Sequence, residues 1–188
     1  MRKLVINTDL CNSWGASEDE FIETAASLGW NGVFSDWSDG KNMNRVRKLT
    51  EANGLFLQSV HAPFTKIAAM WEEGEQGENE LKRQLLCLNE CAEIGAPIVV
   101  EHAIIGFDKH RPNALGIKRF ETLANEAERL GIKLAVENTE GEEYLDRLLG
   151  DLKGHPAVGF CIDTGHEMCY NHSMDLLARF GDRLIMTH

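Results

Sequence analysis

The stretch AERLGIKLAVEN, residues 127–138, decides the fold because it contains a helix end, a strand and a polar strand end in one short run. Its Ala, Glu and Leu residues favour a helix, and Gly131 is the residue type that commonly ends one. The apolar run that follows predicts a strand that ends on the carboxylate of Glu137. The same order of helix, glycine and strand recurs at residues 25–34, 49–57 and 92–100. This internal repeat indicates alternating helices and parallel strands.

Seven strands are predicted, each preceded by enough chain for the crossover helix that parallel strands need. A (β/α)8 TIM barrel takes about 250 residues, whereas the chain has 188. We therefore expect an α/β fold with one domain over residues 1–188, a TIM barrel that stops after its seventh strand. The expected strands are residues 4–8, 32–36, 55–61, 97–102, 133–138, 158–163 and 184–188.

Such an incomplete barrel has two open edges, at its first and seventh strands. Unpaired strand edges invite pairing with another chain. The sequence therefore predicts a homo-oligomer or a strand-exchanged dimer, and a monodisperse monomer in solution would count against this prediction.

The overall charge argues against two classes of partner. The net charge is −11 and the sequence pI is about 5.1, so the average surface repels nucleic acid and anionic membranes. The beginning of the chain lacks the apolar core of a signal peptide, and no apolar run approaches the length of a membrane span. Five cysteines, an odd number, agree with a reducing compartment. We expect a cytoplasmic location, with no nucleic acid or membrane as partner.

Ionisable residues end the last three predicted strands. Glu137, Asp163 and His188 fall at the carboxyl ends of the fifth, sixth and seventh strands, and a barrel brings such ends together. Carboxylates with an imidazole form a mixed shell that suits Mn²⁺, Mg²⁺, Co²⁺ or Zn²⁺. The alternative is that the carboxylates pair with basic groups or cap helices, as Asp163 could before Thr164 and Gly165. Three such residues on neighbouring strands favour a divalent metal site.

Three further histidines are expected around this site. His166 follows Asp163 by one helical turn, and His61 and His102 end the third and fourth strands. Each could be a hydrogen-bonded structural residue. His61 and His102 lie on neighbouring strands that face the carboxylates, which favours a functional role such as binding substrate. His166 could bind substrate or a second metal, and a capping or surface role is equally open.

Two tryptophans are further candidates for substrate binding. Trp14 and Trp37 fall in or beside the loops after the first two strands. An aromatic face stacks on the apolar side of a sugar ring, although packing beneath a loop is the commoner role of a single Trp. The acidic segment at residues 72–78 is expected to be a flexible loop before a helix that opens near Asn79, either solvated or acting as a lid.

At these residues the chain resembles the xylose isomerase-like superfamily of TIM barrels, which includes sugar isomerases and epimerases and the endonuclease IV group. The resemblance spans essentially the whole chain, and its motifs specify the superfamily better than the substrate. They are His61-Ala62-Pro63, Glu137-Asn138-Thr139, Asp163-Thr164-Gly165-His166 and Thr187-His188.

The resemblance implies a metal-dependent sugar or sugar-phosphate isomerase or epimerase. In such enzymes the residues that match Glu137, Asp163 and His188 bind a divalent metal, together with a glutamate on an eighth strand. The metal stabilises an enediolate formed by proton transfer, and Glu137 would be one of two acid/base groups. What matches His166 contacts the substrate. The eighth-strand glutamate has no counterpart in this sequence, so weak metal binding and very low turnover are expected.

Two other functions remain open at this stage. In an endonuclease IV-like zinc phosphodiesterase, His61, His102 and Glu137 would hold one zinc, and Glu137 would share a second with Asp163 and His188. The acidic charge disfavours this alternative because a DNA enzyme should present a basic groove. The remaining alternative is a catalytically inactive barrel that binds a small ligand.

Overall fold

The computed structural model describes residues 3–106 and 111–188, and the seven expected strands lie within them. They form one parallel sheet in which strands adjacent in the chain are adjacent in space. The observed bounds differ from the expected ones by no more than one residue at either end. The strands are β1 (Val5–Asn7), β2 (Gly32–Asp36), β3 (Phe56–His61), β4 (Ile98–His102), β5 (Lys133–Glu137), β6 (Val158–Ile162) and β7 (Leu184–Thr187).

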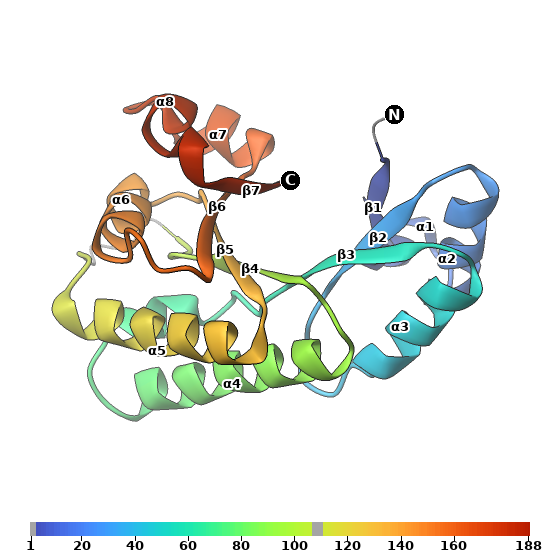
Figure 1. The fold of residues 1–188 in the computed structure, drawn as a ribbon, viewed down its shortest axis with the longest axis horizontal. Coiled ribbons are helices and arrows are strands. Elements are labelled where there is room, and N and C mark those ends of the chain that lie inside the picture. Colours follow the sequence, from blue (N-terminus) through green and yellow to red (C-terminus); the bar gives the residue numbers. More distant parts are fainter. Residues whose placement is uncertain (1–2, 107–110) are drawn as a thin grey trace.

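The sheet curls without closing, because β1 and β7 lie at its two edges and do not pair with each other in the described part of the chain. Figure 1 shows the N-terminal strands and the C-terminal strands facing each other across an open mouth. The prediction of an incomplete TIM barrel is therefore confirmed. The sheet positions all the strand ends that carry the candidate site.

Helices cover the outer side of this half-barrel, with α4 and α5 packed side by side along it (Figure 1). No helix within residues 3–106 and 111–188 is both long and apolar enough to cross a membrane. The helices are α1 (Cys11–Trp14), α2 (Glu18–Ser27), α3 (Met43–Ala52), α4 (Glu75–Glu93), α5 (Ala114–Leu130), α6 (Glu142–Asp151), α7 (Thr164–Tyr170) and α8 (Leu176–Phe180), with 3-10 turns η1 (Thr8–Leu10), η2 (Ile67–Trp71) and η3 (Gly181–Arg183).

The glycine of the opening sequence stretch ends α5 as expected. Gly131 has φ of 74°, and its N–H is bonded to a carbonyl of the last helical turn. This left-handed conformation is strained for residues with a Cβ, so glycine allows the chain to reverse directly into β5.

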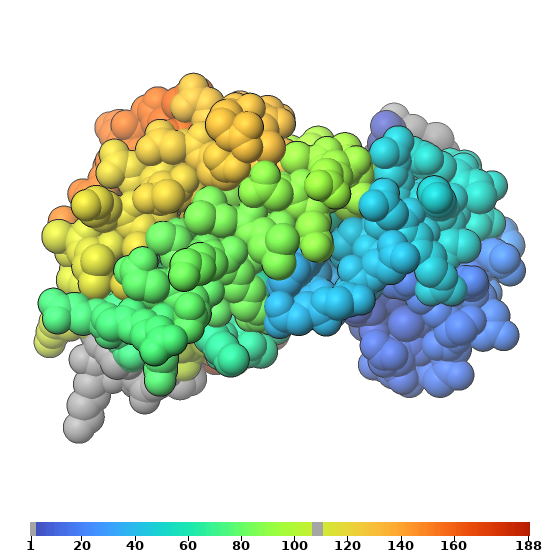
Figure 2. Space-filling model, turned by 90° about the horizontal axis from the view of Figure 1, so that it is seen from below, coloured from blue at the N-terminus to red at the C-terminus, as the bar shows by residue number. Residues whose placement is uncertain are grey.

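The apolar core is divided unequally between the two ends of the molecule. A large cluster lies between β3 to β6 and the helices that cover them, and it includes the fully buried Phe120 and Leu123. A small separate cluster of Ile22, Val33 and Leu55 holds α2 against β2. Figure 2 shows the corresponding division, with the blue to cyan N-terminal part at one end of the elongated molecule and the green to orange part at the other.

The acidic segment at residues 72–78 is not the loop that the sequence predicts. Helix α4 begins at Glu75 rather than near Asn79, since acidic residues in a first turn interact favourably with the helix dipole. Arg119 fixes the segment further, because its guanidinium contacts Glu78 at 2.7 Å and donates to the Glu72 carbonyl at 2.7 Å. The segment packs against α5.

Candidate functional site

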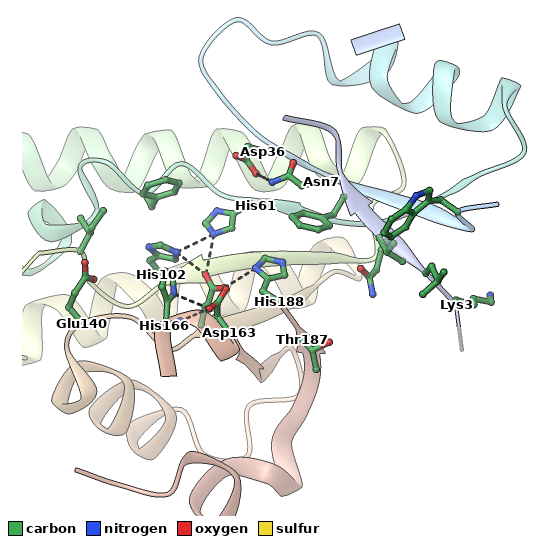
Figure 3. A pocket seen from close by; sticks show the side chains of 18 residues that line it. Lys3, Asn7, Asp36, His61, His102, Glu140, Asp163, His166, Thr187 and His188 are labelled. Atoms are coloured by element: carbon green, nitrogen blue, oxygen red, sulfur yellow. Dashed lines mark hydrogen bonds and ion pairs between the residues drawn. The ribbon is translucent and has the colours of Figure 1, made fainter. Parts of the chain in front are cut away.

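The carboxyl ends of the strands surround a cavity of about 650 Å³ inside the half-barrel. Parallel strands place these ends at the same mouth, so residues far apart in the sequence meet there. Figure 3 shows the histidines and Asp163 pointing toward one another from different strands. The metal and substrate candidates that line the cavity are His61, His102, Glu137, Asp163, His166 and His188.

Glu137 is the centre of this cluster. Its side chain is 1% exposed and makes close contacts with three imidazoles. Its Oε2 lies 2.8 Å from His102 Nε2 and 3.2 Å from His61 Nε2. Its Oε1 lies 2.8 Å from Nδ1 of His188. Both oxygens of this carboxylate are thus engaged by groups that are themselves metal ligands in proteins.

The imidazoles keep Glu137 ionised despite its burial. Burial alone raises the pKa of the Glu137 carboxyl, but hydrogen bonds from His102, His188 and His61 outweigh it and hold the pKa far below its usual range. A buried carboxylate that stays charged is a suitable ligand for a divalent cation.

The two neighbouring histidines respond to Glu137 in opposite directions. Burial lowers the pKa of His61, but the hydrogen bond and charge of Glu137 outweigh burial and leave that pKa raised. For His102, burial lowers the pKa and the contact with Glu137 offsets only part of the effect. The pKa of His61 is therefore raised, whereas that of the neighbouring His102 is lowered.

The hydrogen bonds of His61 provide a test of whether a cation fits here. Its Nδ1 lies 2.8 Å from the Ala62 carbonyl oxygen, so this nitrogen donates and a neutral ring has only a lone pair on Nε2. That lone pair faces Glu137 Oε2 at 3.2 Å and the His102 Nε2 at 3.1 Å. A lone pair and a carboxylate oxygen this close need a shared cation, which is either an extra proton on His61 or a metal ion. His102 does not add to this need, because its Nε2 donates to Glu137 Oε2 at 2.8 Å. The donor set therefore fits a divalent metal.

Ligand atoms converge on Glu137 in three separate groups, within each of which the atoms lie within 4.8 Å of one another. The expected residues Asp163 and His188 share the cavity, but they belong to different groups, each joined to the other candidates through Glu137. The groups are His61 with His102 and Glu137, Glu137 with Cys161 and His188, and Glu137 with Asp163 and His166.

Asp163 has the capping role that the sequence offered as an alternative, and it also lines the cavity. Its Oδ1 accepts the backbone N–H of His166 at 2.6 Å, which starts α7. His166 donates from Nδ1 to the Asn138 carbonyl oxygen at 2.9 Å. In the neutral ring this donation leaves the Nε2 lone pair free to accept a hydrogen bond or bind a metal.

The structure does not place the two tryptophan candidates at the cavity. Trp37 is 3% exposed, and its indole N–H donates to Glu90 on α4 at 2.6 Å. Trp14 is 66% exposed and packs edge-on against Phe21. Strand alternation accounts for Trp37, because it follows the inward-facing Asp36 and therefore points to the opposite side.

Other aromatic residues line the cavity instead, namely Trp30, Phe34 and Phe64. Phe34 stacks on His188 and Phe64 stacks on His102, each with ring centroids 4.8 Å apart. The sequence contained a signal for Phe34, since it lies two residues before Asp36 and shares its face of β2. Phe64 lies in a loop, where no periodicity indicates its direction.

Residues 4–188 match the family described as xylose isomerase-like TIM barrel. The chain belongs to this family. The family match agrees with the parallel half-barrel, and it confirms the resemblance found in the sequence motifs. A comparison with curated proteins gives no significant match.

Solved structures agree on the fold at low sequence identity. A D-allulose 3-epimerase from Methylomonas sp., in complex with D-allulose, gives a TM-score of 0.79 at 16% identity, covering 100% of this chain and 72% of that one. An AP endonuclease of family 2 from Brucella melitensis gives 0.75 at 16% identity, covering 100% and 78%. A fusion of a xylose isomerase-like TIM barrel with a 4-hydroxyphenylpyruvate dioxygenase gives a TM-score of 0.78 at 18% identity, covering 100% of this chain and 31% of the fusion protein. The chain thus spans less than a third of the fusion protein.

Proposed function

We propose that this protein is a metal-dependent sugar or sugar-phosphate isomerase or epimerase. The observation that carries the proposal is the buried, ionised Glu137 at the centre of three imidazoles, in a cavity that Asp163 and His166 also line. Two solved structures with a similar fold support the proposal, because both proteins are sugar epimerases with a sugar present. One is a D-psicose 3-epimerase in the presence of D-fructose, and the other is a D-allulose 3-epimerase in complex with D-allulose.

In this proposal Glu137, Asp163 and His188 hold the divalent metal, which is Mn²⁺, Mg²⁺, Co²⁺ or Zn²⁺. When bound, the ion stabilises negative charge on neighbouring carbonyl and hydroxyl oxygens. His166 offers Nε2 to a substrate hydroxyl, while His61 and His102 orient Glu137 from the opposite side. Phe34 and Phe64 shield the reacting end of the sugar from water.

Glu137 is also the proposed proton-transfer group. A carboxylate that accepts several hydrogen bonds is a weak base, so proton transfer requires at least one imidazole to turn away from it. His188 is placed for this change, since its Nε2 is buried without a hydrogen-bond partner and, within residues 3–106 and 111–188, its imidazole makes one hydrogen bond, to Glu137. A His188 that binds the metal would release Glu137 Oε1.

Solvent exchange tests this proposed chemistry. The Mn²⁺-loaded protein is incubated in D₂O with D-fructose, D-allulose or D-tagatose, and deuterium next to the carbonyl carbon is followed by NMR. The wild type should exchange deuterium slowly, as the low turnover expected from the sequence implies. The control Asp39→Asn, at an exposed residue paired with Arg83, should match it, whereas Glu137→Gln should show no exchange. No exchange by metal-loaded wild type, or equal exchange by Glu137→Gln, would refute the proposal.

An endonuclease IV-like zinc phosphodiesterase is the second candidate. A specific observation favours it, because His61, His102 and Glu137 form a compact ligand group and the AP endonuclease shares the fold. The net charge of −11 weighs against a DNA substrate. Cleavage of an oligonucleotide with one abasic site, in the presence of Zn²⁺, would favour this candidate over the epimerase.

We propose a cytoplasmic location, because free cysteines, most of them buried, are compatible with a reducing compartment.

We also propose that copies of the chain associate through the free edges of β1 and β7. The exposed apolar side chains of Leu4 beside β1 and Ile185 on β7 support contact at these edges.

A further inference from the structure

Asp36 and Asn7 form a polar pair on the wall of the cavity provided by β1 and β2. Both side chains line the cavity, and Figure 3 shows them together beside His61. Asn7 donates from Nδ2 to Asp36 Oδ1 over a long 3.4 Å contact. This is the one hydrogen bond recorded for the Asp36 carboxylate within residues 3–106 and 111–188. A carboxylate has about four acceptor positions, so Asp36 has unused capacity toward the cavity.

The backbone holds Asp36 in place independently of that contact. Its N–H donates to the Asp9 carboxylate at 2.8 Å, and Asp9 is itself clamped by Lys41 at 2.9 Å. The Asn7 side chain is fixed as well, because its Oδ1 accepts the N–H of Asp9 at 2.8 Å. The pair is therefore positioned before any ligand arrives, which lowers the entropic cost of binding.

Asp36 is partly buried, and no cation among the described residues forms an ion pair with its carboxylate. Burial raises the pKa of the Asp36 carboxyl, and the nearby Asp9 raises it further. Hydroxyl donors from a ligand would replace the hydration that this carboxylate has lost. Lys41 does not serve as its counter-ion, because the Lys41 ammonium is held by Asp9 and by Glu18 at 3.4 Å.

The pair lies within reach of a substrate bound at Glu137. Asp36 is in register with His61 on the next strand, and His61 contacts Glu137 at 3.2 Å. A sugar whose carbonyl end is held near Glu137 would extend past His61 toward Asp36. The hydroxyl-bearing end of the chain would then meet the polar pair.

The charge around the cavity excludes a phosphate at that end. The fixed anions that line it are Asp36, Glu137, Glu140 and Asp163, and no arginine is among the described lining residues. Lys3 is the lysine in that lining, and it lies over the Phe56 ring at 4.7 Å, well apart from Asp36 in Figure 3. A phosphate ester near Asp36 would meet like charge at close range, whereas both ring nitrogens of the neighbouring His61 are already engaged, by Glu137 and by the Ala62 carbonyl.

From this geometry we propose that Asp36 and Asn7 form a subsite for the hydroxyl groups of an uncharged polyol chain, so that the substrate is a free sugar rather than its phosphate ester. The inference rests on the proposed function, and it selects one of the two substrate classes that the function leaves open. Asp36 accepts hydrogen bonds from two neighbouring hydroxyls, and Asn7 donates to an oxygen of the same chain.

Calorimetric titration of Mn²⁺-loaded protein with D-fructose and with D-fructose 6-phosphate tests the subsite. The wild type should bind the free sugar at least about tenfold more tightly than the phosphate. Asp36→Asn should weaken binding of the free sugar by about tenfold, the effect of losing hydrogen bonds to a charged acceptor. Asp36→Asn should also reduce the ratio of the affinity for D-fructose to that for D-fructose 6-phosphate. If Asp36 had a purely structural role, this ratio would not change. Metal content should stay unchanged.

Asp39→Asn is the matched control, because it removes the same charge from the loop that follows β2, outside the cavity. Asn7→Ser retains an oxygen near the start of η1 and should also weaken binding of D-fructose, which keeps the test valid if Asp36→Asn does not fold. Equal affinity for D-fructose in Asp36→Asn and Asp39→Asn, or a wild type that prefers the phosphate, would overturn the subsite. If the wild type binds metal but neither ligand, the proposed function itself fails, and the subsite with it.

Discussion

The two walls of the cavity are built by different means. The wall formed by β4 to β6 is backed by the large apolar core, and Glu137 on it is 1% exposed. The wall formed by β1 and β2 is backed by a small cluster around Ile22, and polar contacts between Asp9 and Lys41 supply much of its cohesion. Regions with few buried apolar contacts open at lower free energy. We therefore expect the wall that carries Glu137 to be rigid. The wall that carries Asp36 and Asn7 should open more readily as a unit, although hydrogen bonds fix these two residues relative to each other.

The largest expected effect comes from removing a large buried side chain from the apolar core behind the β4–β6 wall. Phe120 is 0% exposed and packs against Trp71 with ring centroids 5.4 Å apart. Phe120→Ala should lower the free energy of unfolding by about 3–5 kcal/mol, because a close-packed core fills such a void only in part. Urea unfolding followed by circular dichroism measures the change.

Ile22→Ala in the other wall is the matched comparison. Ile22 is also 0% exposed, but its cluster is small, so neighbouring side chains can close the space. Its cost should lie near about 2 kcal/mol, the low end for such substitutions. Hydrogen exchange should accelerate in α2, β1 and β2 and leave β4 to β6 unchanged. Uniform acceleration across both walls would contradict the comparison.

A smaller effect is expected from the polar contacts that support the β1–β2 wall. Asp9 accepts from the Lys41 ammonium at 2.9 Å and from the Asp36 N–H at 2.8 Å. Asp9→Asn should destabilise the protein by about 1–2 kcal/mol, since it weakens hydrogen bonds that involve a charged acceptor. Thermal unfolding measures the loss.

The control for Asp9→Asn is Asp19→Asn. Asp19 pairs with Arg45 on the surface, with side chains 40% and 52% exposed, and such pairs contribute about 0.5 kcal/mol or less. If both substitutions had the same small effect, the polar contacts of Asp9 would not be what holds this wall.

The fold could be predicted because its signals are local in the sequence. Each helix, glycine and strand repeat specifies its own element, as at Gly131 and β5. Parallel strands must end at a common edge, so the meeting of Glu137, Asp163 and His61 followed from the topology. The start of α4 was predicted four residues too late, because the contacts of Arg119 with Glu78 and the Glu72 carbonyl come from a helix far along the chain.

The site was less predictable because the direction of a side chain depends on tertiary packing. Alternation along a strand predicts that Glu101 points to the opposite side of β4 from His102. The Glu101 carboxyl does lie on the α4 side, where burial and then the charge of Glu80 raise its pKa well above the usual value. The same alternation, applied to Asp36 at the end of β2, would have predicted that Trp37 points away from the cavity. Trp14 lies on a short helix, and no sequence periodicity indicates what such a residue faces.

The division of ligand atoms into three groups around Glu137 could not be read from the sequence either. Strand order places the side chains on one rim, but the pairings depend on rotamers and on the curl of the sheet. The separation of Asp163 from His188 in these groups is a property of the folded chain alone.

The central claim is that Glu137 gathers its neighbours into a divalent metal site, and metal titration tests this claim most directly. Wild-type protein, Glu137→Gln and the surface control Asp39→Asn are stripped with chelator and titrated with Co²⁺, with visible absorption and elemental analysis as readouts. The wild type and Asp39→Asn should bind a stoichiometric ion with absorption bands of imidazole and carboxylate ligation, and Glu137→Gln should bind at least about 100-fold more weakly. Equal Co²⁺ affinity in Glu137→Gln and wild type, or no binding by the wild type, would contradict the account.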